Sequence, residues 1–558
     1  MERNNLSVNK KRNKNKMRRI LFSLAVLLMS LNAVAKREAT PVYLVAGQSN
    51  TDGRVPNEEL PMYIQQGKYK HCYWSYGSGT VSGKGQFEMF WPRMINKNNP
   101  NRWAYDAVVN YWLEQSLGRD FYVIKESLGG TAIDTAATSN QKMYWSADPQ
   151  YLASTAATDK GGKSLLKAFT DNIGDCIDNK LSRLKGGYDI KAFIWHQGES
   201  DRKKAGNYYK NLKGVVSHIR QYLVKKTGNK KYANLPVIIG GIVFSGNGHA
   251  NDVARAQMRL ASEDENIHYI DVHDATLRSD NIHFDAAGAE LLGRKIYNKL
   301  ASLNLAGKNA RQIPYSQKSH MYQVGNGRTF MFASFPDKPT EPMRAVVACP
   351  GGGYSHLAIT HEGTDWAKFF NDRGMAYFTL IYRMPNGDRT IPMSDAEAAI
   401  KMVRDSAEAW HINPDAIGIM GSSAGGHLAS TVATHADAPC RPNFQILFYP
   451  VITFANATHN GSKVNFLGND KDNEDMQKLF SNERQVRKGT TPPAIILLAS
   501  DDKTVPALTN GVAYYEALVS QGIPAALHCY QSGGHGFGFN KSFKYHDQLL
   551  NDISEWLK

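Results

Sequence analysis

The pentapeptide Gly421-Ser422-Ser423-Ala424-Gly425 has the spacing of a serine nucleophile held on a sharp turn. The apolar run 416–420 precedes it as an expected strand, and residues 426–436 follow as an expected helix. Flanking glycines let such a turn pass close to neighbouring strands, and the serine oxygen then lies exposed at the positive end of the helix. The pattern predicts Ser423 as the nucleophile of an acyl-transfer site.

The partners of this serine are expected downstream, an acid first and then a histidine. Asp502 follows the predicted strand 495–499, and His535 follows the predicted strand 525–530, so both lie at the carboxyl ends of strands. Asp501 is the rival acid. Backbone amides of Gly352, Gly353 and Ala424 are the predicted oxyanion donors, since bare glycines allow close approach to a negative oxygen.

The first half contains a second set of such residues without a G-x-S-x-G motif. Ser49 stands beside a glycine at the end of the predicted strand 42–46. Far downstream, Asp280 and His283 have a D-x-x-H spacing, which lets the carboxylate reach the imidazole and fix its tautomer. The other ring nitrogen is then free for Ser49.

Two further segments of the first half supply candidate oxyanion donors. Gly130 and Gln197 each follow a predicted strand, and their backbone and side-chain amides are suited to the role, with the amide of Ser49 as a third donor. Glu199 has two interpretations: a second carboxylate that supports His283, or a structural hydrogen-bond acceptor.

The second half resembles the α/β-hydrolase superfamily, in particular its acetylxylan and feruloyl esterase branch. The resemblance covers about 314–558. The motifs that carry it are Cys349-Pro350-Gly351-Gly352-Gly353-Tyr354, Glu362-Gly363, Tyr382-Arg383, Gly421 to His427, Asp502 to Pro506 and His535-Gly536-Phe537. It implies a Ser423–His535–Asp502 triad, because the D-x-x-V-P spacing that begins at Asp502 matches the pattern of this fold and favours Asp502 over Asp501. His427 and His361 are expected to be structural.

The first half resembles the SGNH hydrolases of carbohydrate esterase family 6 and the related sialate O-acetylesterases, over about 39–303. The motifs that carry it are Gly47-Gln48-Ser49-Asn50, Gly129-Gly130-Thr131, His196-Gln197-Gly198-Glu199-Ser200-Asp201 and Asp280 to His283. Gln197 stands where many SGNH members have Asn. The resemblance implies a flavodoxin-like three-layer domain and the second-carboxylate role for Glu199.

Apolar β-rich runs alternate with helical stretches in both halves, so the fold class is α/β with parallel sheets covered on both faces. Helices are expected over 285–303 and over 394–410, the latter with Ser394 as its N-cap. A polar stretch after residue 303 marks the domain boundary. The predicted division is a signal peptide over 1–35, an SGNH domain over 36–305, a linker over 306–320 and an α/β-hydrolase domain over 321–558. The other predicted strands are 121–125, 190–195, 236–243, 267–272, 345–349, 377–382 and 444–449.

The formal charge of +15 is concentrated at the start, where eight Lys or Arg residues and one acid lie in the first 35 positions. They precede an apolar run, 20–29, and the small residues Ala33-Val34-Ala35, which together predict a signal peptide cleaved after Ala35, with Met1 or Met17 as the start. The expected location is periplasmic or extracellular. The remaining basic bias predicts a solvated surface rather than a nucleic-acid partner, and no later segment is apolar enough to predict a membrane span.

Five scattered cysteines without a C-x-x-C motif predict no metal site and no disulfide framework, although one disulfide stays open. Serine chemistry of this kind needs no cofactor. The resemblances imply an exported bifunctional acetylxylan esterase acting on acetylated polysaccharide. Two further readings stay open: a sialate O-acetylesterase joined to a feruloyl esterase, or one domain serving only to bind polysaccharide. Trp74, Trp91, Trp103 and Trp145 either stack on sugars or, as the stronger expectation, pack in the core.

Overall fold

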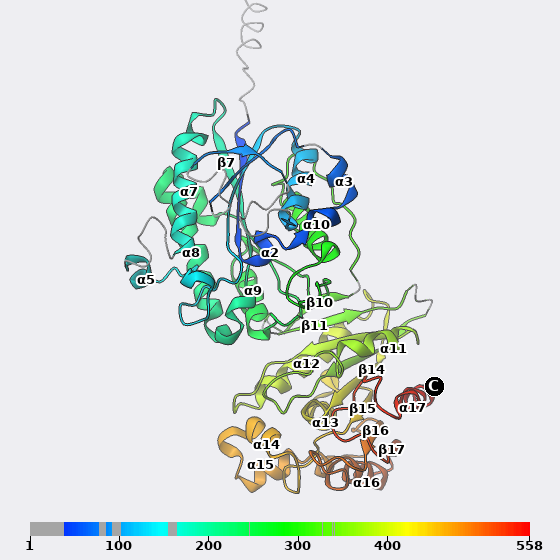
Figure 1. Ribbon diagram of the computed structural model, residues 1–558. Coiled ribbons are helices and arrows are strands. Elements are labelled where there is room, and N and C mark those ends of the chain that lie inside the picture. The colour runs from blue at the N-terminus through cyan, green and yellow to red at the C-terminus, as the bar shows by residue number, and fades with distance from the viewer. Residues whose placement is uncertain are drawn as a thin grey trace, which may run out of the picture.

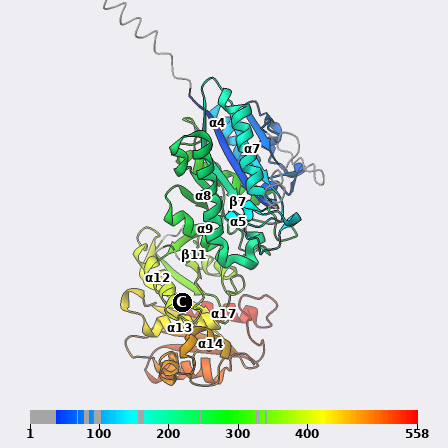
Figure 2. The same ribbon diagram turned by 90° about the vertical axis from the view of Figure 1, so that its left-hand side faces the viewer.

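The computed structural model shows two α/β domains lying end to end (Figures 1 and 2). It describes residues 38–67, 69–77, 85–91, 102–154, 164–244, 246–317, 319–325, 327, 329–337, 339 and 341–558. The predicted signal peptide and its cleavage site lie outside these ranges. Within them, no helix combines the length and apolar character that a membrane crossing requires.

A seven-stranded sheet in the order β4-β3-β6-β1-β7-β8-β9 forms the centre of the first domain. All its pairings are parallel except that of β4 with β3. The strands are β1 (Thr40–Gly47), β3 (Cys72–Tyr76), β4 (Glu88–Met89), β6 (Phe121–Ser127), β7 (Tyr188–His196), β8 (Val237–Gly240) and β9 (Ile267–Ile270), and a short pair, β2 (Val55–Pro56) with β5 (Arg102–Trp103), lies apart.

Helices cover both faces of this sheet, as the strand–helix alternation predicts. One apolar cluster joins α7, α8 and α9 to one face, and a second cluster joins α4 and α10 to the other. Helix α10 begins after Asp285, whose carboxylate caps it by accepting from Gly288 N. The helices are α2 (Ser49–Asp52), α3 (Met62–Gln66), α4 (Tyr105–Leu117), α5 (Pro149–Ala153), α7 (Leu165–Asn179), α8 (Tyr208–Thr227), α9 (Asn251–Glu263) and α10 (Ala286–Ser302).

The second domain has an eight-stranded sheet in the order β10-β11-β13-β12-β14-β15-β16-β17. Strands β10 and β11 form an antiparallel hairpin at one edge, and the other pairings are parallel apart from that of β11 with β13. The strands are β10 (His320–Val324), β11 (Thr329–Ser334), β12 (Met343–Cys349), β13 (Ala376–Ile381), β14 (Ile412–Ser422), β15 (Phe444–Phe448), β16 (Ala494–Ala499) and β17 (Ala525–Tyr530).

Helices also cover both faces of the second sheet, α11 and α17 on one and α12, α13 and α16 on the other. Helix α12 begins at Thr390, so the predicted N-cap at Ser394 is wrong. Ser394 lies inside the helix and donates to Ile391 O, and Pro392 fits because the first turn needs no amide donor. The helices are α11 (Ala367–Asn371), α12 (Thr390–Asp405), α13 (Ala424–His435), α14 (Asn460–Leu467), α15 (Glu474–Leu479), α16 (Ala513–Ser520) and α17 (His546–Trp556).

Core packing accounts for three of the four tryptophans that the sequence offers for sugar stacking. Trp74, Trp103 and Trp145 are buried, whereas Trp91 is 47% exposed. The five cysteines are free thiols.

Aromatic packing joins the two domains at the hairpin β10–β11, which lies at the junction in both ribbon views (Figures 1 and 2). Phe332 of β11 stacks on His273 of the first domain with ring centroids 4.1 Å apart. Phe244 contacts Phe330 and Phe332 at centroid distances of 5.3 and 4.7 Å. These rings are buried, so one apolar cluster continues from the first domain into the second.

A carboxylate supports this junction from the first-domain side. Asp271 accepts from His273 Nδ1 at 2.7 Å, and the other ring nitrogen of His273 lies 2.5 Å from Ser319 Oγ. Burial alone would raise the pKa of Asp271, but the charges of His273 and Lys295 outweigh it and lower the pKa to about 2.

We expect the Asp271 contribution to stability to be lost in acid. Since its folded pKa lies below the unfolded value of about 3.9, the ionised carboxylate stabilises the folded chain fully above pH ~4 and progressively less toward pH ~2. Asp271→Asn should therefore lower the free energy of unfolding by about 2 kcal/mol at pH ~6 and flatten its fall below pH ~4. Urea unfolding curves across this range measure both. The matched control is Asp178→Asn, because Asp178 is a 60% exposed carboxylate, and equal pH slopes in the two variants would contradict the prediction.

Candidate active sites

The nucleophile candidate of the second domain, Ser423, stands between strand β14 and helix α13. Its backbone has φ 53° and ψ −120°, a strained conformation that is rare for a residue with a side chain. A Cβ on Gly421 would lie 2.2 Å from Gly425 O, and one on Gly425 would lie 2.0 Å from Cys349 O. The turn is thus possible only with glycine at both flanking positions, as the sequence predicts.

Three side chains meet at this turn. His535 Nε2 lies 2.8 Å from Ser423 Oγ, and His535 Nδ1 lies 2.7 Å from Asp502 Oδ2. Asp501, the rival acid, instead accepts from the backbone N–H of Gly534 at 2.7 Å. The geometry therefore selects Asp502 as the partner of the imidazole.

The ionisation of Asp502 determines which nitrogen of His535 carries the proton. Burial raises the pKa of Asp502, but hydrogen bonds from His535 and from the amides of Val505 and Thr504 outweigh it, so the pKa falls below its usual value. An ionised Asp502 accepts the Nδ1 proton of His535. Nε2 is then unprotonated and accepts from Ser423 Oγ–H, the arrangement needed for a general base.

The oxyanion loop, residues 350–353, lies beside the nucleophile. Gly351 N is already engaged, because it donates to Glu362 Oε2 at 2.7 Å. Gly352 and Gly353 have φ of 132° and 63°, which favour glycine. Their amides and that of Ala424, the first residue of α13, are the donors left at the site.

Glu362 and Tyr449 belong to the site but were not assigned a role from sequence. Glu362 Oε1 accepts from Tyr449 OH at 2.8 Å, and Tyr449 OH accepts from Gly538 N at 3.0 Å. The Tyr449 ring lies 4.8 Å from that of His535. This buried bridge ties the oxyanion loop to the histidine loop; the position of Tyr449 directly after strand β15 was the signal that could have identified it.

His427 is structural, as expected from sequence. It is fully buried, lies 2.9 Å from Tyr354 OH through Nδ1, and lies 2.9 Å from Phe480 O through Nε2. Burial lowers its pKa to about 3, so it stays neutral and anchors Tyr354 behind the oxyanion loop.

The nucleophile candidate of the first domain, Ser49, follows β1 as the first residue of the short helix α2. A Cβ on Gly47 would lie 2.1 Å from His196 O and 2.4 Å from Thr51 Oγ1, so only glycine fits where β1 turns into α2. Ser49 is thereby placed at the carboxyl end of the central strand, where α/β sheets hold their sites.

His283 and Asp280 form the predicted local pair. His283 Nδ1 lies 2.7 Å from Asp280 Oδ2, and Asp280 Oδ1 accepts from the amides of Ile282 and His283. Desolvation raises the pKa of Asp280, but these hydrogen bonds outweigh it and lower the pKa to about 2. Over the described part of the chain no hydrogen bond joins Ser49 to His283; in unliganded sites such contacts are often long and tighten with substrate.

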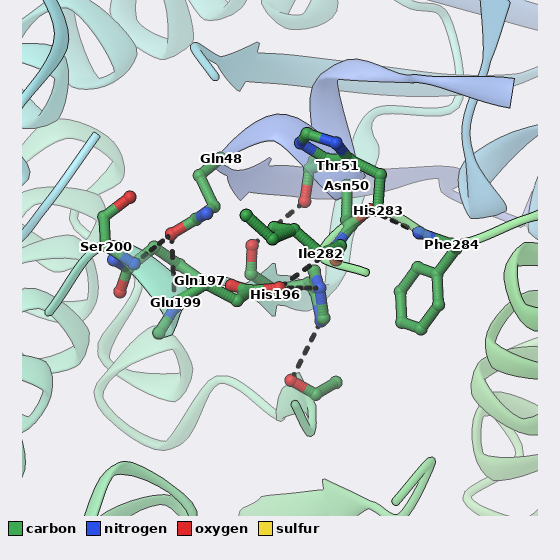
Figure 3. Close-up of polar contacts among 12 residues, drawn as sticks. Gln48, Asn50, Thr51, His196, Gln197, Glu199, Ser200, Ile282, His283 and Phe284 are labelled. Atoms are coloured by element: carbon green, nitrogen blue, oxygen red, sulfur yellow. Dashed lines mark hydrogen bonds and ion pairs between the residues drawn. The ribbon is translucent and has the colours of Figure 1, made fainter. Parts of the chain in front are cut away.

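Glu199 bonds to Asn50 and His196 rather than to His283, so of its two interpretations the contacts favour a structural hydrogen-bond acceptor. Glu199 Oε1 accepts from Asn50 Nδ2 at 2.9 Å and lies 3.4 Å from His196 Nε2. Asn50 Oδ1 in turn accepts from Phe284 N at 3.1 Å (Figure 3). Glu199 thus acts through Asn50, the residue after the nucleophile, on the loop that carries His283.

The side-chain amide of Gln197, a predicted oxyanion donor, is committed elsewhere. Its Nε2 donates to Asp201 Oδ2 at 2.6 Å and to Thr131 O at 3.1 Å, and its Oε1 accepts from Tyr208 OH. Both amide protons are used, so the contacts of Gln197 do not support the predicted role. Its buried position fits a structural support for the loop that follows β6.

That loop brings Gly129 and Gly130 to the nucleophile. A Cβ on Gly129 would lie 3.3 Å from Ser49 Cβ and 2.0 Å from Arg54 Nη2, so the backbone passes directly beside Ser49. Asn140 fixes it by donating to Gly129 O and to Gly130 O. Gly130 N and Ser49 N remain the oxyanion candidates. Among the described residues, no group of three or more His, Cys, Asp or Glu side chains is placed to hold a metal ion.

Comparison with known families agrees with this division into two sites. Residues 39–302 match the family model of carbohydrate esterases described as sialic acid-specific acetylesterase, and residues 333–517 match the model named BD-FAE. The chain thus joins a sialic acid-specific acetylesterase-type, SGNH-like domain to an α/β-hydrolase domain of the BD-FAE type.

The names of individual relatives refer to ester hydrolysis or to xylan. An acetylxylan esterase of Xylanibacter ruminicola is 49% identical over 251 residues, covering 44% of this chain and 52% of that protein. An endo-1,4-beta-xylanase B of Butyrivibrio fibrisolvens is 31% identical over 41% of this chain and 38% of its own length. The acetyl ester-xyloside bifunctional hydrolase of Caldicellulosiruptor lactoaceticus, a solved structure, is 32% identical over 41% of this chain and 87% of its own, with a TM-score of 0.39. The chain therefore spans about half or less of the two curated relatives.

Proposed function

We propose that this chain is an exported bifunctional carbohydrate esterase that removes O-acetyl groups from xylan through two independent serine sites. The observation that carries the proposal is the hydrogen-bonded series Ser423–His535–Asp502 on a strained turn. The homology to an acetylxylan esterase over part of the chain supports acetylated xylan as the substrate class.

In the second domain, His535 takes the proton of Ser423 Oγ as that oxygen attacks the ester carbonyl. The negative oxygen that forms is positioned to accept from the amides of Gly352, Gly353 and Ala424, where each such donor contributes about 3–4 kcal/mol to the transition state. His535 then protonates the sugar oxygen as it leaves. In the second half of the cycle it activates the water that releases acetate.

In the first domain the same steps fall to Ser49 and His283, with Asp280 holding the imidazole. Gly130 N and Ser49 N are the proposed oxyanion donors. The Asn50 bridge between Glu199 and Phe284 supports this assignment, because it fixes the histidine loop relative to the turn of the nucleophile.

The test separates the two sites in the full chain. Acetate release from acetylated xylan should fall partly in Ser49→Ala, partly in Ser423→Ala, and by more than about 10³-fold in the double variant. Complete loss in either single variant would refute the two-site proposal. A first domain that only binds polysaccharide predicts no change in Ser49→Ala. Parallel assays on O-acetylated sialic acid and on feruloylated xylan test whether the first domain is a sialate O-acetylesterase and the second a feruloyl esterase.

A further inference from the structure

We propose that Arg255, on helix α9 of the first domain, is a positioning residue for the oxyanion loop of the second domain. The inference rests on the proposed function of Ser423 and extends it, because it makes the second site depend on a side chain from the other domain. Helix α9 lies at the junction of the two domains in both ribbon views (Figures 1 and 2).

The guanidinium of Arg255 reaches across the junction to the end of strand β13. Its Nη2 donates to two successive carbonyls, Ile381 O and Tyr382 O, each at 3.0 Å. Its Nη1 donates to Asp252 Oδ1 on the same helix at 3.0 Å, and the side chain is only 15% exposed. Hydrogen bonds from a buried guanidinium to backbone carbonyls are strong, because a charged donor gives a stronger hydrogen bond than a neutral donor.

The side chain of Tyr382, at the end of β13, connects this strand to the oxyanion loop. Tyr382 is fully buried, and its OH donates to Pro350 O at 2.6 Å. Pro350 directly precedes Gly351, whose amide donates to Glu362, and the two candidate oxyanion donors that follow it, Gly352 and Gly353. A shift of Tyr382 therefore moves the start of the loop and, with it, the donors at Gly352 and Gly353.

Side chains of the second domain also form hydrogen bonds with the backbone at the end of β13, next to the two carbonyls that Arg255 binds. Arg383 N donates to Asp395 Oδ2 at 2.8 Å, and Arg383 Nη2 donates to Asp395 Oδ1 at 2.6 Å. Ile381 O also accepts from Thr329 Oγ1 of the hairpin. The carbonyl that follows has its side-chain donor in the first domain. Arg255 is thus the part of this clamp that the α/β-hydrolase domain does not itself supply.

Helix α9 is firmly fixed in its own domain, which makes it a rigid support. Two positions after Arg255, Gln257 Nε2 donates to Gln197 O at 2.9 Å, next to the network behind the first site. The buried apolar residues Val253, Ala254 and Met258 of α9 pack in the core. A clamp on a rigid element preserves loop geometry, and small displacements of catalytic groups are costly in rate.

The experiment uses the full chain carrying Ser49→Ala, so that p-nitrophenyl acetate reports the second site alone. Arg255→Ala should lower kcat about tenfold with KM changed less than twofold, since the loop acts on the transition state. Arg255→Lys keeps the positive charge but replaces the planar, multi-donor guanidinium with an ammonium group, so it should recover part of the loss. The matched control is Arg259→Ala, one turn along α9, where a 57% exposed side chain pairs with Glu263.

A double-mutant cycle with Tyr382→Phe tests the route. Tyr382→Phe should lower kcat by a similar factor, and the Arg255→Ala, Tyr382→Phe pair should show no further loss, because both changes break one chain of contacts. Additive losses, or a kcat for Arg255→Ala within twofold of the parent in a chain of unchanged melting temperature, would overturn the inference. A separate control tests the proposed function of Ser423: hydrolysis by the Ser49→Ala parent should disappear when Ser423→Ala is added. If it does not, the proposed function fails; if it does and Arg255→Ala has no effect, only the inference about Arg255 fails.

Discussion

Asp502→Asn is expected to lower kcat of the second site by about 10⁴-fold, the loss seen when the acid of a serine triad is made neutral. The Asp502 side chain is 2% exposed and lies 2.7 Å from His535 Nδ1. Water cannot replace its charge there, so the imidazolium that forms during attack is left without its partner, and the asparagine amide also favours the wrong tautomer. The measurement is kcat on p-nitrophenyl acetate in the Ser49→Ala background.

Asp501→Asn is the matched control, since it removes the same charge one residue away. Asp501 accepts from Gly534 N, and an asparagine oxygen can accept that bond as well. We expect kcat to stay within about threefold of the parent. Equal losses in the two variants would mean that His535 is held by the loop as a whole rather than by the Asp502 carboxylate.

Asp280→Asn should lower kcat of the first site by about 10³-fold, less than its counterpart in the second domain. Asp280 makes an equally short contact with its histidine, but its side chain is 46% exposed. Solvent around an exposed pair screens the carboxylate charge, so part of its effect on the imidazolium is already supplied by water. The assay is acetate release from acetylated xylan in the Ser423→Ala background.

The control for this prediction is Asp285→Asn, on the same loop. Asp285 caps helix α10, and asparagine is an equally good N-cap, so neither activity nor stability should change appreciably. A larger loss from Asp285→Asn than from Asp280→Asn would show that loop order, not the carboxylate on His283, limits the first site.

The three side chains of the second site meet as the sequence predicts, because each lies in a short motif that directly follows a strand. The G-x-S-x-G turn is enforced by contacts of Gly421 and Gly425 that leave no room for a Cβ. The acid follows the fully buried apolar strand β16, and the histidine follows the half-buried edge strand β17. The choice of Asp502 over Asp501 rested on the resemblance to the α/β-hydrolase pattern, through the D-x-x-V-P spacing. The hydrogen bond to His535 now gives it a geometric reason.

The first site was predicted less completely because its supports come from distant segments. Gln197 carries an amide suited to an oxyanion, but Asp201, four residues later, takes one of its protons. Two interpretations of Glu199 were open, a carboxylate that supports His283 or a structural hydrogen-bond acceptor, and the structure places Asn50 between Glu199 and the histidine loop. Which of several polar neighbours a buried group bonds to depends on tertiary packing, and spacing along the chain does not determine it.

The edge hairpin β10–β11 was also missed from the sequence. Its first strand is mostly exposed or half-buried, and it lies within and just after the stretch assigned to a linker, so apolar periodicity gave no strong signal there. Its second strand is buried between β10 and β13, with Phe330 and Phe332 packed against Phe244 of the first domain. The apolar periodicity of one domain's sequence does not reveal which of its residues are buried against the other domain.

The aromatic contact of Phe330 and Phe332 with Phe244 has a consequence for synthesis of the chain. The first domain leaves the ribosome first, and its Phe244 and His273 rings lack their contacts with Phe330 and Phe332 until the hairpin of the second domain emerges. A nascent or truncated chain ending near residue 318 therefore presents an aromatic patch to other molecules, a recognised cause of aggregation. Expression of the first domain alone should require the hairpin to be retained, or these rings to be replaced by polar residues.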